Sequence, residues 1–137
     1  LLREAAEVLG DPLVMEEVNS ASSKIAEASM EGWSPEGGMV YEYDPKSGHR
    51  DADRHWWVQA ETVVGCVDRF GLTGDRIWLE RAGMEWKFIR ENLISPDGEW
   101  YWSVRADGTV NLTDDRAGFW KCPYHNGRMC LEMLARL

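Results

Sequence analysis

The chain has 137 residues, enough for one domain with a sizeable core. Its formal net charge is −9 and its Lys and Arg residues form no cluster, so binding to nucleic acid is not expected. No apolar run is long enough to span a membrane and no signal peptide leads the chain, which favours a cytoplasmic protein without a membrane contact.

The first third of the chain shows helical spacing. Residues 1–10 predict a helix that ends at Gly10, and because no capping residue precedes it we expect the tail of a longer helix. Asp11-Pro12 opens a second helix that runs to about Gly32. The segment GGMVYEYD, residues 37–44, then alternates as a short extended piece would.

The middle of the chain predicts two more helices. The third runs from Trp56 to about Phe70, and the fourth runs from Gly74-Asp75 to about Leu93. The apolar stripe of the third helix keeps the spacing i, i+4, i+7 and consists of Trp56, Ala60, Val63, Val67 and Phe70. On the fourth helix the shared side is expected to hold Trp78, Ala82, Glu85 or Trp86, Ile89 and Leu93.

After the break at Pro96-Asp97-Gly98, a hairpin is expected. In it residues 100–104 would pair with Thr109-Val110 across the Asp107-Gly108 turn. A fifth helix follows from Asn126 or Gly127. The predicted fold class is therefore all-α: helical hairpins with short β-ribbons near residues 38–44 and 100–110.

One candidate site lies on the third helix, where Trp57 and Glu61 are four residues apart and share a face outside the apolar stripe. An indole beside a carboxylate suits sugar recognition, because the ring stacks on the sugar and the carboxylate accepts from its hydroxyls. The alternative is a helix that packs on two sides, with Glu61 paired to a neighbouring arginine.

A second candidate stretch, WKCPYHNGR, contains Trp120, His125 and Arg128. Trp120 offers another stacking surface, and a histidine can exchange protons near neutral pH. A single histidine is more often structural than catalytic. A catalytic role for His125 is favoured only if it faces the same cavity as Trp57 and Glu61.

The string His49, Asp51, Asp53, His55 superficially resembles a set of metal ligands. Its spacing matches no defined zinc or calcium motif, so no metal site is predicted. No motif for a phosphate-bearing cofactor or a catalytic serine is present. Among three cysteines without a paired motif, Cys66 is expected to be a buried, reduced thiol.

Three stretches together resemble the N-acylglucosamine 2-epimerase family. They are RHWWVQAE, GEWYWSV-x-x-DG and WKCPYHNGR, in residues 54–61, 98–108 and 120–128. The resemblance covers the whole chain but only about the C-terminal third of such an enzyme. It implies an (α/α)6 barrel with a central cleft, of which residues 1–137 would be a partial domain.

The resemblance also implies an isomerase that needs no cofactor and acts on a small carbohydrate. The reducing-end glucose of a β-1,4-linked disaccharide such as cellobiose would be epimerised at C2 to mannose. In the family two histidines move the proton through a cis-enediolate, and His125 matches one of them. Trp57, Glu61 and Trp120 match substrate-binding residues, and Arg128 falls within the same motif.

By this resemblance the second catalytic histidine and an arginine that supports the enediolate would precede Leu1. The chain alone is therefore expected to be inactive, and its open hydrophobic flank is expected to favour self-association. Two other functions remain open: a glycoside hydrolase on a similar barrel, which needs a second carboxylate beside Glu61, and a carbohydrate-binding module.

Overall fold

The structure is a computed structural model that describes residues 1–136, and the chain folds as two compact units. The first unit is Leu1–Glu31 and the second begins at Gly32. No helix among the described residues combines the length and the apolarity that crossing a membrane requires. The prediction of one domain over residues 1–137 stays a prediction.

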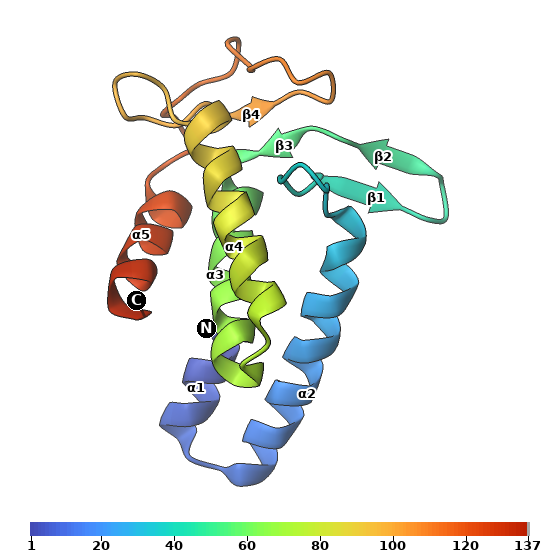
Figure 1. Ribbon diagram of the computed structural model, residues 1–137, viewed down its shortest axis with the longest axis vertical. Coiled ribbons are helices and arrows are strands. Elements are labelled where there is room, and N and C mark those ends of the chain that lie inside the picture. Colours follow the sequence, from blue (N-terminus) through green and yellow to red (C-terminus); the bar gives the residue numbers. More distant parts are fainter. Residues whose placement is uncertain (137) are drawn as a thin grey trace. The chain divides into compact units, whose positions relative to one another are not determined.

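The first unit is a helical hairpin of α1 (Leu2–Leu9) and α2 (Pro12–Ser29), as the sequence predicts (Figure 1). Gly10 ends α1 with a φ of 72°, a left-handed conformation that glycine adopts without a steric penalty. The Asp11 carboxylate then caps α2 by accepting the N–H of Leu13 at 2.9 Å.

The second unit is built on three helices, with α4 and α5 beside α3 (Figure 1). Their bounds are α3 (Trp56–Thr73), α4 (Arg76–Phe88) and α5 (Tyr124–Arg136), with a one-turn π-helix η2 (Ile89–Leu93) after α4. A 3-10 turn, η1 (Met30–Gly32), stands at the boundary between the two units. Gly74 and the capping Asp75 join α3 to α4, where the sequence placed the turn.

The core of the second unit confirms most of the predicted apolar stripe of α3. This core contains Trp56, Ala60 and Val63 of α3. They pack with Ile89 and Leu93 of η2, Met129 of α5, and Trp100 and Val104 of the segment after η2. Of the two residues between which the sequence could not choose on α4, Glu85 is buried and Trp86 is partly exposed. Cys66 is buried as predicted, and burial raises the pKa of its thiol to about 12.

Within residues 1–136, four short strands form two antiparallel ribbons. The bounds and pairs are β1 (Glu42–Asp44) with β2 (His49–Asp51), and β3 (Arg54–His55) with β4 (Ser103–Val104). The first ribbon contains the strand expected from residues 37–44. The second ribbon joins the segment before α3 to the segment after η2.

The predicted hairpin over residues 100–110 is confirmed at its turn and in part of its pairing. The N–H of Arg105 donates to the carbonyl of Thr109 at 2.8 Å, the N–H of Asn111 donates to the carbonyl of Ser103 at 2.9 Å, and an antiparallel bridge joins Val104 to Val110. Trp100, at the start of the expected arm, forms a bridge with Ile94 instead. Ser103 and Val104 also pair with β3, so β4 pairs both with a distant strand and with the neighbouring arm.

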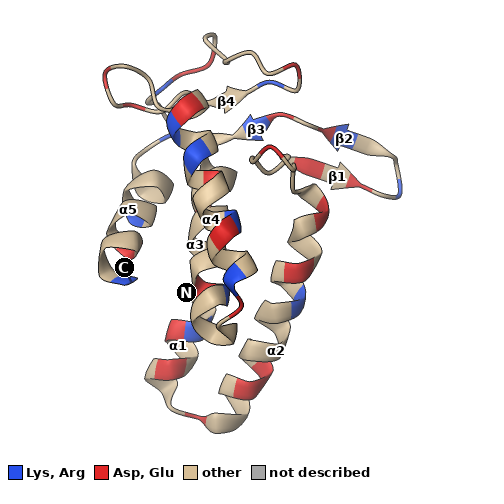
Figure 2. Cartoon of the chain, viewed as in Figure 1, with Lys and Arg blue, Asp and Glu red and all other residues tan. Residues whose placement is uncertain are grey.

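Charged residues of both signs are interspersed on the helices and ribbons (Figure 2). This distribution agrees with the scattered Lys and Arg residues of the sequence. That nucleic acid is not a partner stays a prediction.

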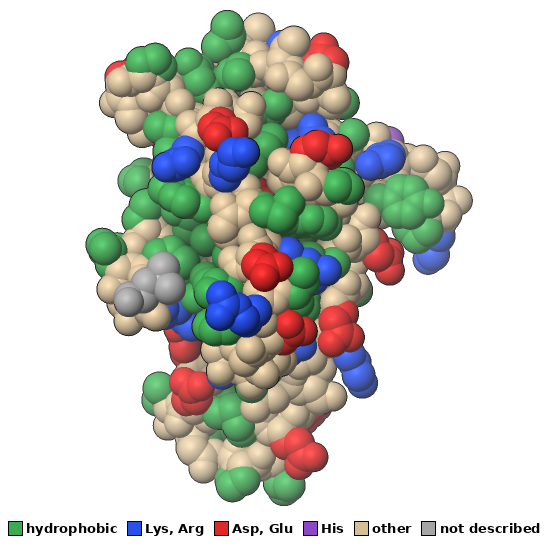
Figure 3. Space-filling model, in the orientation of Figure 1, with side chains coloured by type: hydrophobic (Ala, Val, Ile, Leu, Met, Phe, Trp, Pro, Cys, Tyr) green, Lys and Arg blue, Asp and Glu red, His purple; other side chains and the backbone are tan. Residues whose placement is uncertain are grey.

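An apolar groove of about 680 Å³ opens between α3, α4 and α5. Its lining comprises Val63, Val67, Leu79, Ala82, Gly83, Trp86, Met129, Cys130, Met133 and Leu134. Hydrophobic side chains are visible between α5 on the left and α4 in the centre (Figure 3). The open hydrophobic flank expected from the sequence, and self-association through it, stay predictions.

Two buried polar side chains hold the backbone of the segment before β1. Glu85 Oε2 accepts the N–H of Gly38 at 3.0 Å, and Gln59 bonds both the N–H and the carbonyl of Met39, at 2.6 and 2.9 Å. Gly38 has a φ of 91°, and a Cβ there would lie 2.7 Å from Arg54 Cδ. Glycine is therefore required where this segment crosses α3 and α4.

Glu85 makes the stability of the protein depend on pH. Burial raises the pKa of its carboxyl to about 8, although the N–H of Gly38 and Arg54 act in the opposite direction. Because this pKa lies above the unfolded value, the stabilisation is complete below about pH 4.5 and is lost as the pH rises through about 8. Glu85→Gln, which mimics the protonated acid, is expected to raise the free energy of unfolding at pH 8 by a few kcal/mol, since one pKa unit is worth about 1.4 kcal/mol.

Thermal unfolding of wild type and variant near pH 5 and near pH 9 measures this effect. The two proteins should melt alike at the lower pH and separate at the higher one. Glu80→Gln is the matched control, because Glu80 is exposed on the same helix. An equal shift at both pH values would contradict the assignment to Glu85 ionisation.

Candidate active site

The first half of the candidate site is the face of α3 that carries Trp57 and Glu61. Their spacing of four residues places them one turn apart, on a different side from the core residues Trp56 and Ala60. Trp57 is 37% exposed and the Glu61 side chain is 33% exposed. A stacking surface and a carboxylate therefore both remain accessible outside the core.

The second half is the first turn of α5, which begins earlier than the sequence indicated. The prediction started this helix at Asn126 or Gly127 and placed His125 on a loop, but α5 begins at Tyr124. The carbonyl of Pro123 accepts the N–H of Gly127 at 2.9 Å, which closes the first helical turn. Asn and Gly are poor helix formers, but their position in the first turn of a packed helix makes them tolerable.

This earlier start gives His125 and Arg128 a common helix face, because residues three apart are neighbours on a helix. His125 Nδ1 lies 2.7 Å from Glu61 Oε1. Arg128 Nη2 donates to both oxygens of the same carboxylate. Two residues of α5 therefore converge on one residue of α3 that is more than sixty positions earlier in the chain.

The arginine pair that was the structural alternative for Glu61 is present in this cluster, and a role of Glu61 in sugar recognition stays a prediction. The arginine is Arg128, itself a candidate site residue beside His125. Burial acts to raise the pKa of the Glu61 carboxyl, but hydrogen bonds and charge from Arg128 and His125 outweigh it and lower that pKa. Glu61 is therefore ionised at neutral pH and can only accept hydrogen bonds.

Aromatic rings surround His125 on three sides. The ring centroids of Trp56, Trp57 and Tyr124 lie 5.4, 5.6 and 4.8 Å from that of the imidazole. The Tyr124 ring also lies under the Arg128 guanidinium, at 5.6 Å. Tyr124 was not among the site residues predicted from the sequence, although its place next to His125 in WKCPYHNGR was a signal.

The sequence of the chain matches a known protein family over most of its length. The family model for N-acylglucosamine 2-epimerase (GlcNAc 2-epimerase) matches residues 11–127. The chain belongs to this family.

Relatives in the N-acylglucosamine 2-epimerase family include well-matched cellobiose 2-epimerases. The chain is 54% identical to the cellobiose 2-epimerase of Bacteroides fragilis over 98% of its own length and 34% of the relative. It also matches the solved structures of a sugar epimerase from a ruminal bacterium and of cellobiose 2-epimerase from Bacillus thermoamylovorans B4167. Their TM-scores are 0.91 and 0.83, each at 36% identity, covering 98% and 97% of this chain and 35% and 34% of the others.

These comparisons confirm the predicted fold class. Cellobiose 2-epimerases are (α/α)6 barrels, and the mostly helical chain with short strands corresponds to part of one. The chain spans about a third of the length of the relatives it matches.

Trp120 is the predicted site residue that the structure leaves apart. Its side chain is 81% exposed, and its ring contacts Phe119 edge-on at 4.9 Å between centroids. The interactions described within residues 1–136 do not join it to His125, Glu61 or Trp57. A substrate-binding role for Trp120, which the family resemblance implies, stays a prediction.

Tyr41 and His55 extend the aromatic surface beyond Trp57, although neither was predicted as a residue of this site. Tyr41 meets Trp57 edge-on at 6.1 Å and stacks on His55 at 4.1 Å. The alternation of GGMVYEYD predicted the strand but gave no signal of which tyrosine would face the histidine. Their placement depends on the crossing of the segment before β1 over α3.

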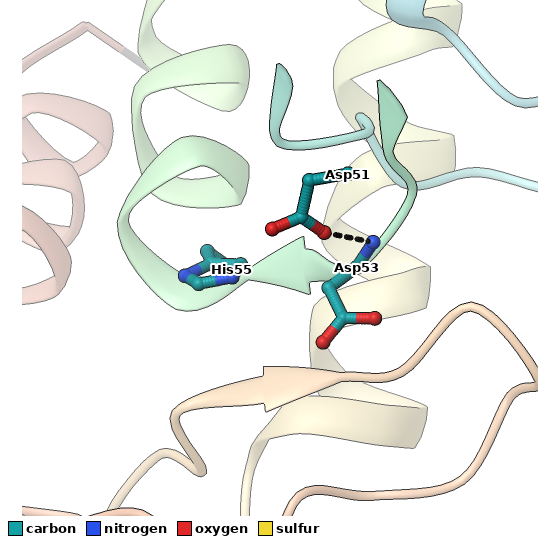
Figure 4. Close-up of side chains that lie close together, drawn as sticks. All are labelled: Asp51, Asp53 and His55. Carbon is teal, nitrogen blue, oxygen red and sulfur yellow. Dashed lines mark hydrogen bonds between the residues drawn. The ribbon is translucent and has the colours of Figure 1, made fainter. Parts of the chain in front are cut away.

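Three of the four residues in the metal-like string come together (Figure 4). One ligand atom each from Asp51, Asp53 and His55 lies within 4.8 Å of the others, whereas His49 pairs with Asp44 in the first ribbon. One oxygen of each aspartate already accepts a backbone N–H, from Asp53 and from Ala106, both at 2.9 Å.

The group around His55 therefore serves the bend between β2 and β3. Burial lowers the pKa of His55, and the carboxylates of Asp51, Asp53 and Asp114 oppose that shift. The prediction that the protein has no metal site stays a prediction.

Proposed function

We propose that this chain is part of a sugar 2-epimerase. The substrate class is a β-1,4-linked disaccharide such as cellobiose, whose reducing-end glucose is converted reversibly to mannose. One observation carries the proposal: His125, Glu61 and Arg128 form a hydrogen-bonded cluster beside Trp57, in a chain that is 54% identical to a cellobiose 2-epimerase.

The reaction needs a base and an acid but no change of oxidation state. In the ring-opened sugar the C1 carbonyl acidifies the hydrogen on C2. A base removes this hydrogen as a proton, and its electron pair forms the C1–C2 double bond of a cis-enediolate. Return of a proton to the opposite face of C2 gives the epimer, so atoms and charge balance without a cofactor.

His125 is suited to one of these proton transfers because Glu61 selects its tautomer. An ionised carboxylate only accepts, so Nδ1 is the nitrogen that donates to Glu61 Oε1 at 2.7 Å. In the neutral ring the lone pair is then on Nε2, which is the atom that takes or returns the C2 proton. A second acid–base group on the opposite face of the sugar completes the epimerisation.

The remaining residues bind and orient. The exposed face of Trp57 stacks on a sugar ring, as aromatic side chains in carbohydrate sites do. The remaining lone pairs of the Glu61 carboxylate accept a hydrogen bond from a sugar hydroxyl. Arg128 holds the Glu61 carboxylate with two hydrogen bonds, so its main contribution is to fix the partner of His125. Trp120 supplies a second stacking surface from its exposed position.

Glu61 fits this role better than that of a glycosidase acid. A general acid in a glycoside hydrolase needs a raised pKa so that it stays protonated near neutral pH. The pKa of Glu61 is lowered by Arg128 and His125 after burial has acted to raise it. The hydrolase alternative therefore lacks its proton donor at this residue.

A hybrid enzyme tests the proposal. Residues 1–137 replace the matching third of the Bacteroides fragilis cellobiose 2-epimerase, and this protein is called the hybrid below. Incubated with cellobiose in heavy water, the hybrid is expected to form glucosyl-mannose with deuterium at C2, as detected by NMR. The unmodified Bacteroides enzyme is the positive control.

The two alternatives give different products in the same assay. Release of free glucose would support the hydrolase. Saturable binding of cellobiose by the folded hybrid, without deuterium at C2, would support a carbohydrate-binding module and overturn the epimerase proposal.

A further inference from the structure

Lys121 is a buried lysine in the segment that leads into α5. Its side chain is 2% exposed, although a buried ammonium is costly unless it is fully paired. Three acceptors surround Nζ: Glu99 Oε1 at 3.1 Å and the carbonyls of Trp100 and Arg116 at 2.8 and 2.6 Å. Each of its three N–H donors therefore has an acceptor.

The ammonium of Lys121 joins the three stretches that carry the family resemblance. Glu99 and Trp100 belong to GEWYWSV, Lys121 to WKCPYHNGR, and Trp56 to RHWWVQAE. Lys121 Nζ lies 4.9 Å from the centroid of the Trp56 ring, within the range of a cation–π contact. One charge therefore joins two segments that lie about twenty and about sixty-five residues before it in the sequence.

The partners of Lys121 connect it to the candidate base in two ways. The Trp56 ring is buried and meets the His125 ring edge-on at 5.4 Å. The indole that contacts Lys121 therefore also packs against one side of the imidazole. Along the chain, Lys121 is four residues before His125, with Pro123 between them at the start of α5. Fixing Lys121 therefore restrains both the Trp56 indole and the helix turn on which His125 sits.

We propose that Lys121 is a positioning residue for the proton transfer: its ammonium sets the orientation of the His125 imidazole through Trp56 and through the first turn of α5. The inference rests on the proposed function, because it assigns His125 the proton transfer. Lys121 is not a catalytic residue, since its three donors are engaged within the protein. Displacing a reacting group by about 1 Å lowers the rate by about 10²-fold, so loss of the restraint on His125 should lower kcat measurably.

The partner Glu99 provides a milder way to disturb the same contact. Its side chain is 42% exposed, so Glu99→Gln leaves no uncompensated charge deep in the core. Burial acts to raise the pKa of the Glu99 carboxyl, but the N–H of Trp100 and the Lys121 ammonium, among other groups, lower it overall. The glutamine keeps an acceptor for Lys121 and removes the charge.

The test compares Lys121→Met and Glu99→Gln with the control Lys46→Met in the hybrid. Lys46 is exposed in the turn between β1 and β2, so the control makes the same chemical change away from the site. We expect Lys121→Met to lower kcat for cellobiose by about 10²-fold with a much smaller change in KM. Glu99→Gln should lower kcat less, and Lys46→Met should leave both constants unchanged.

A second readout follows the His125 ring itself. Three aromatic rings surround it, so the NMR signal of its Cε1 proton carries ring-current shifts that report its orientation. The signal should move in Lys121→Met and Glu99→Gln, while that of His49, exposed in β2, should stay in place. A kcat loss accompanied by an unmoved His125 signal would overturn the proposal, as would normal kcat in a folded Lys121→Met.

The two readouts separate this inference from the proposed function. If the unsubstituted hybrid binds cellobiose but does not epimerise it, the proposed function fails, and the His125 signal still decides whether Lys121 orients the ring. If Lys121→Met does not fold, Glu99→Gln decides: a moved His125 signal with lowered kcat supports the proposal, and an unmoved signal overturns it.

Discussion

Replacing His125 by asparagine in the hybrid is expected to lower kcat for cellobiose epimerisation by about 10²- to 10⁴-fold, the contribution of one general acid–base group. Asparagine keeps a polar side chain of similar reach, so the contact with Glu61 can be retained. What is lost is the Nε2 lone pair that exchanges the C2 proton. Binding of cellobiose should change little, because the proposed function assigns recognition to Trp57 and Glu61.

Deuterium incorporation at C2 in heavy water is the direct measure of this step, because every epimerised molecule must acquire its new proton through the acid–base pair. Incorporation and turnover should fall together in His125→Asn. His49→Asn is the matched control, since His49 lies in the exposed ribbon of β1 and β2. Near-normal turnover of His125→Asn would make His125 a structural residue and remove the mechanism.

Replacing Glu61 by glutamine is expected to lower kcat by about 10²- to 10⁴-fold. This range spans the cost of misplacing a reacting group and that of losing the carboxylate that orients a catalytic histidine. Glutamine presents one oxygen and one NH₂ group where His125 and Arg128 both need an acceptor. One of the two donors then loses its partner, and the Arg128 charge loses its counter-ion.

A double-mutant cycle with Arg128→Met shows whether the three residues act as one unit. If Arg128 acts by holding Glu61, the double variant should lose little more activity than Glu61→Gln alone. Additive losses would instead assign Arg128 an independent contact with the sugar. Glu42→Gln, on an exposed position of β1, controls for the loss of a negative charge.

Much of the fold could be predicted because its signals are local. The caps at Asp11 and Asp75 and the left-handed glycines at positions 10 and 74 mark helix ends by the conformations that they adopt. The stripe of α3 was visible because residues that share a helix face recur every three to four positions. The same rule could not choose between Glu85 and Trp86 on α4, since they lie three and four positions after Ala82 and both satisfy the helical spacing.

The start of α5 was the local feature that the sequence concealed. Asn126 and Gly127 weaken a helix in isolation, and Pro123 suggested a stiff loop rather than the carbonyl that closes the first turn. Packing of Met129 into the core outweighs these propensities. As a result His125 and Arg128 share a helix face, which a loop would not have given them.

Periodicity alone therefore placed Trp57 beside Glu61, because four residues of one helix form one turn, and the aromatic and histidine-containing stretches marked the other candidates. That these candidate residues lie together is decided by the tertiary structure. A contact between Glu61 and His125 spans more than sixty residues and exists because α3 and α5 pack side by side. The same holds for the pairing of β3 with β4 and for the burial of Lys121 between three segments. Chain spacing carries no information about such contacts, since they depend on which apolar faces bury each other.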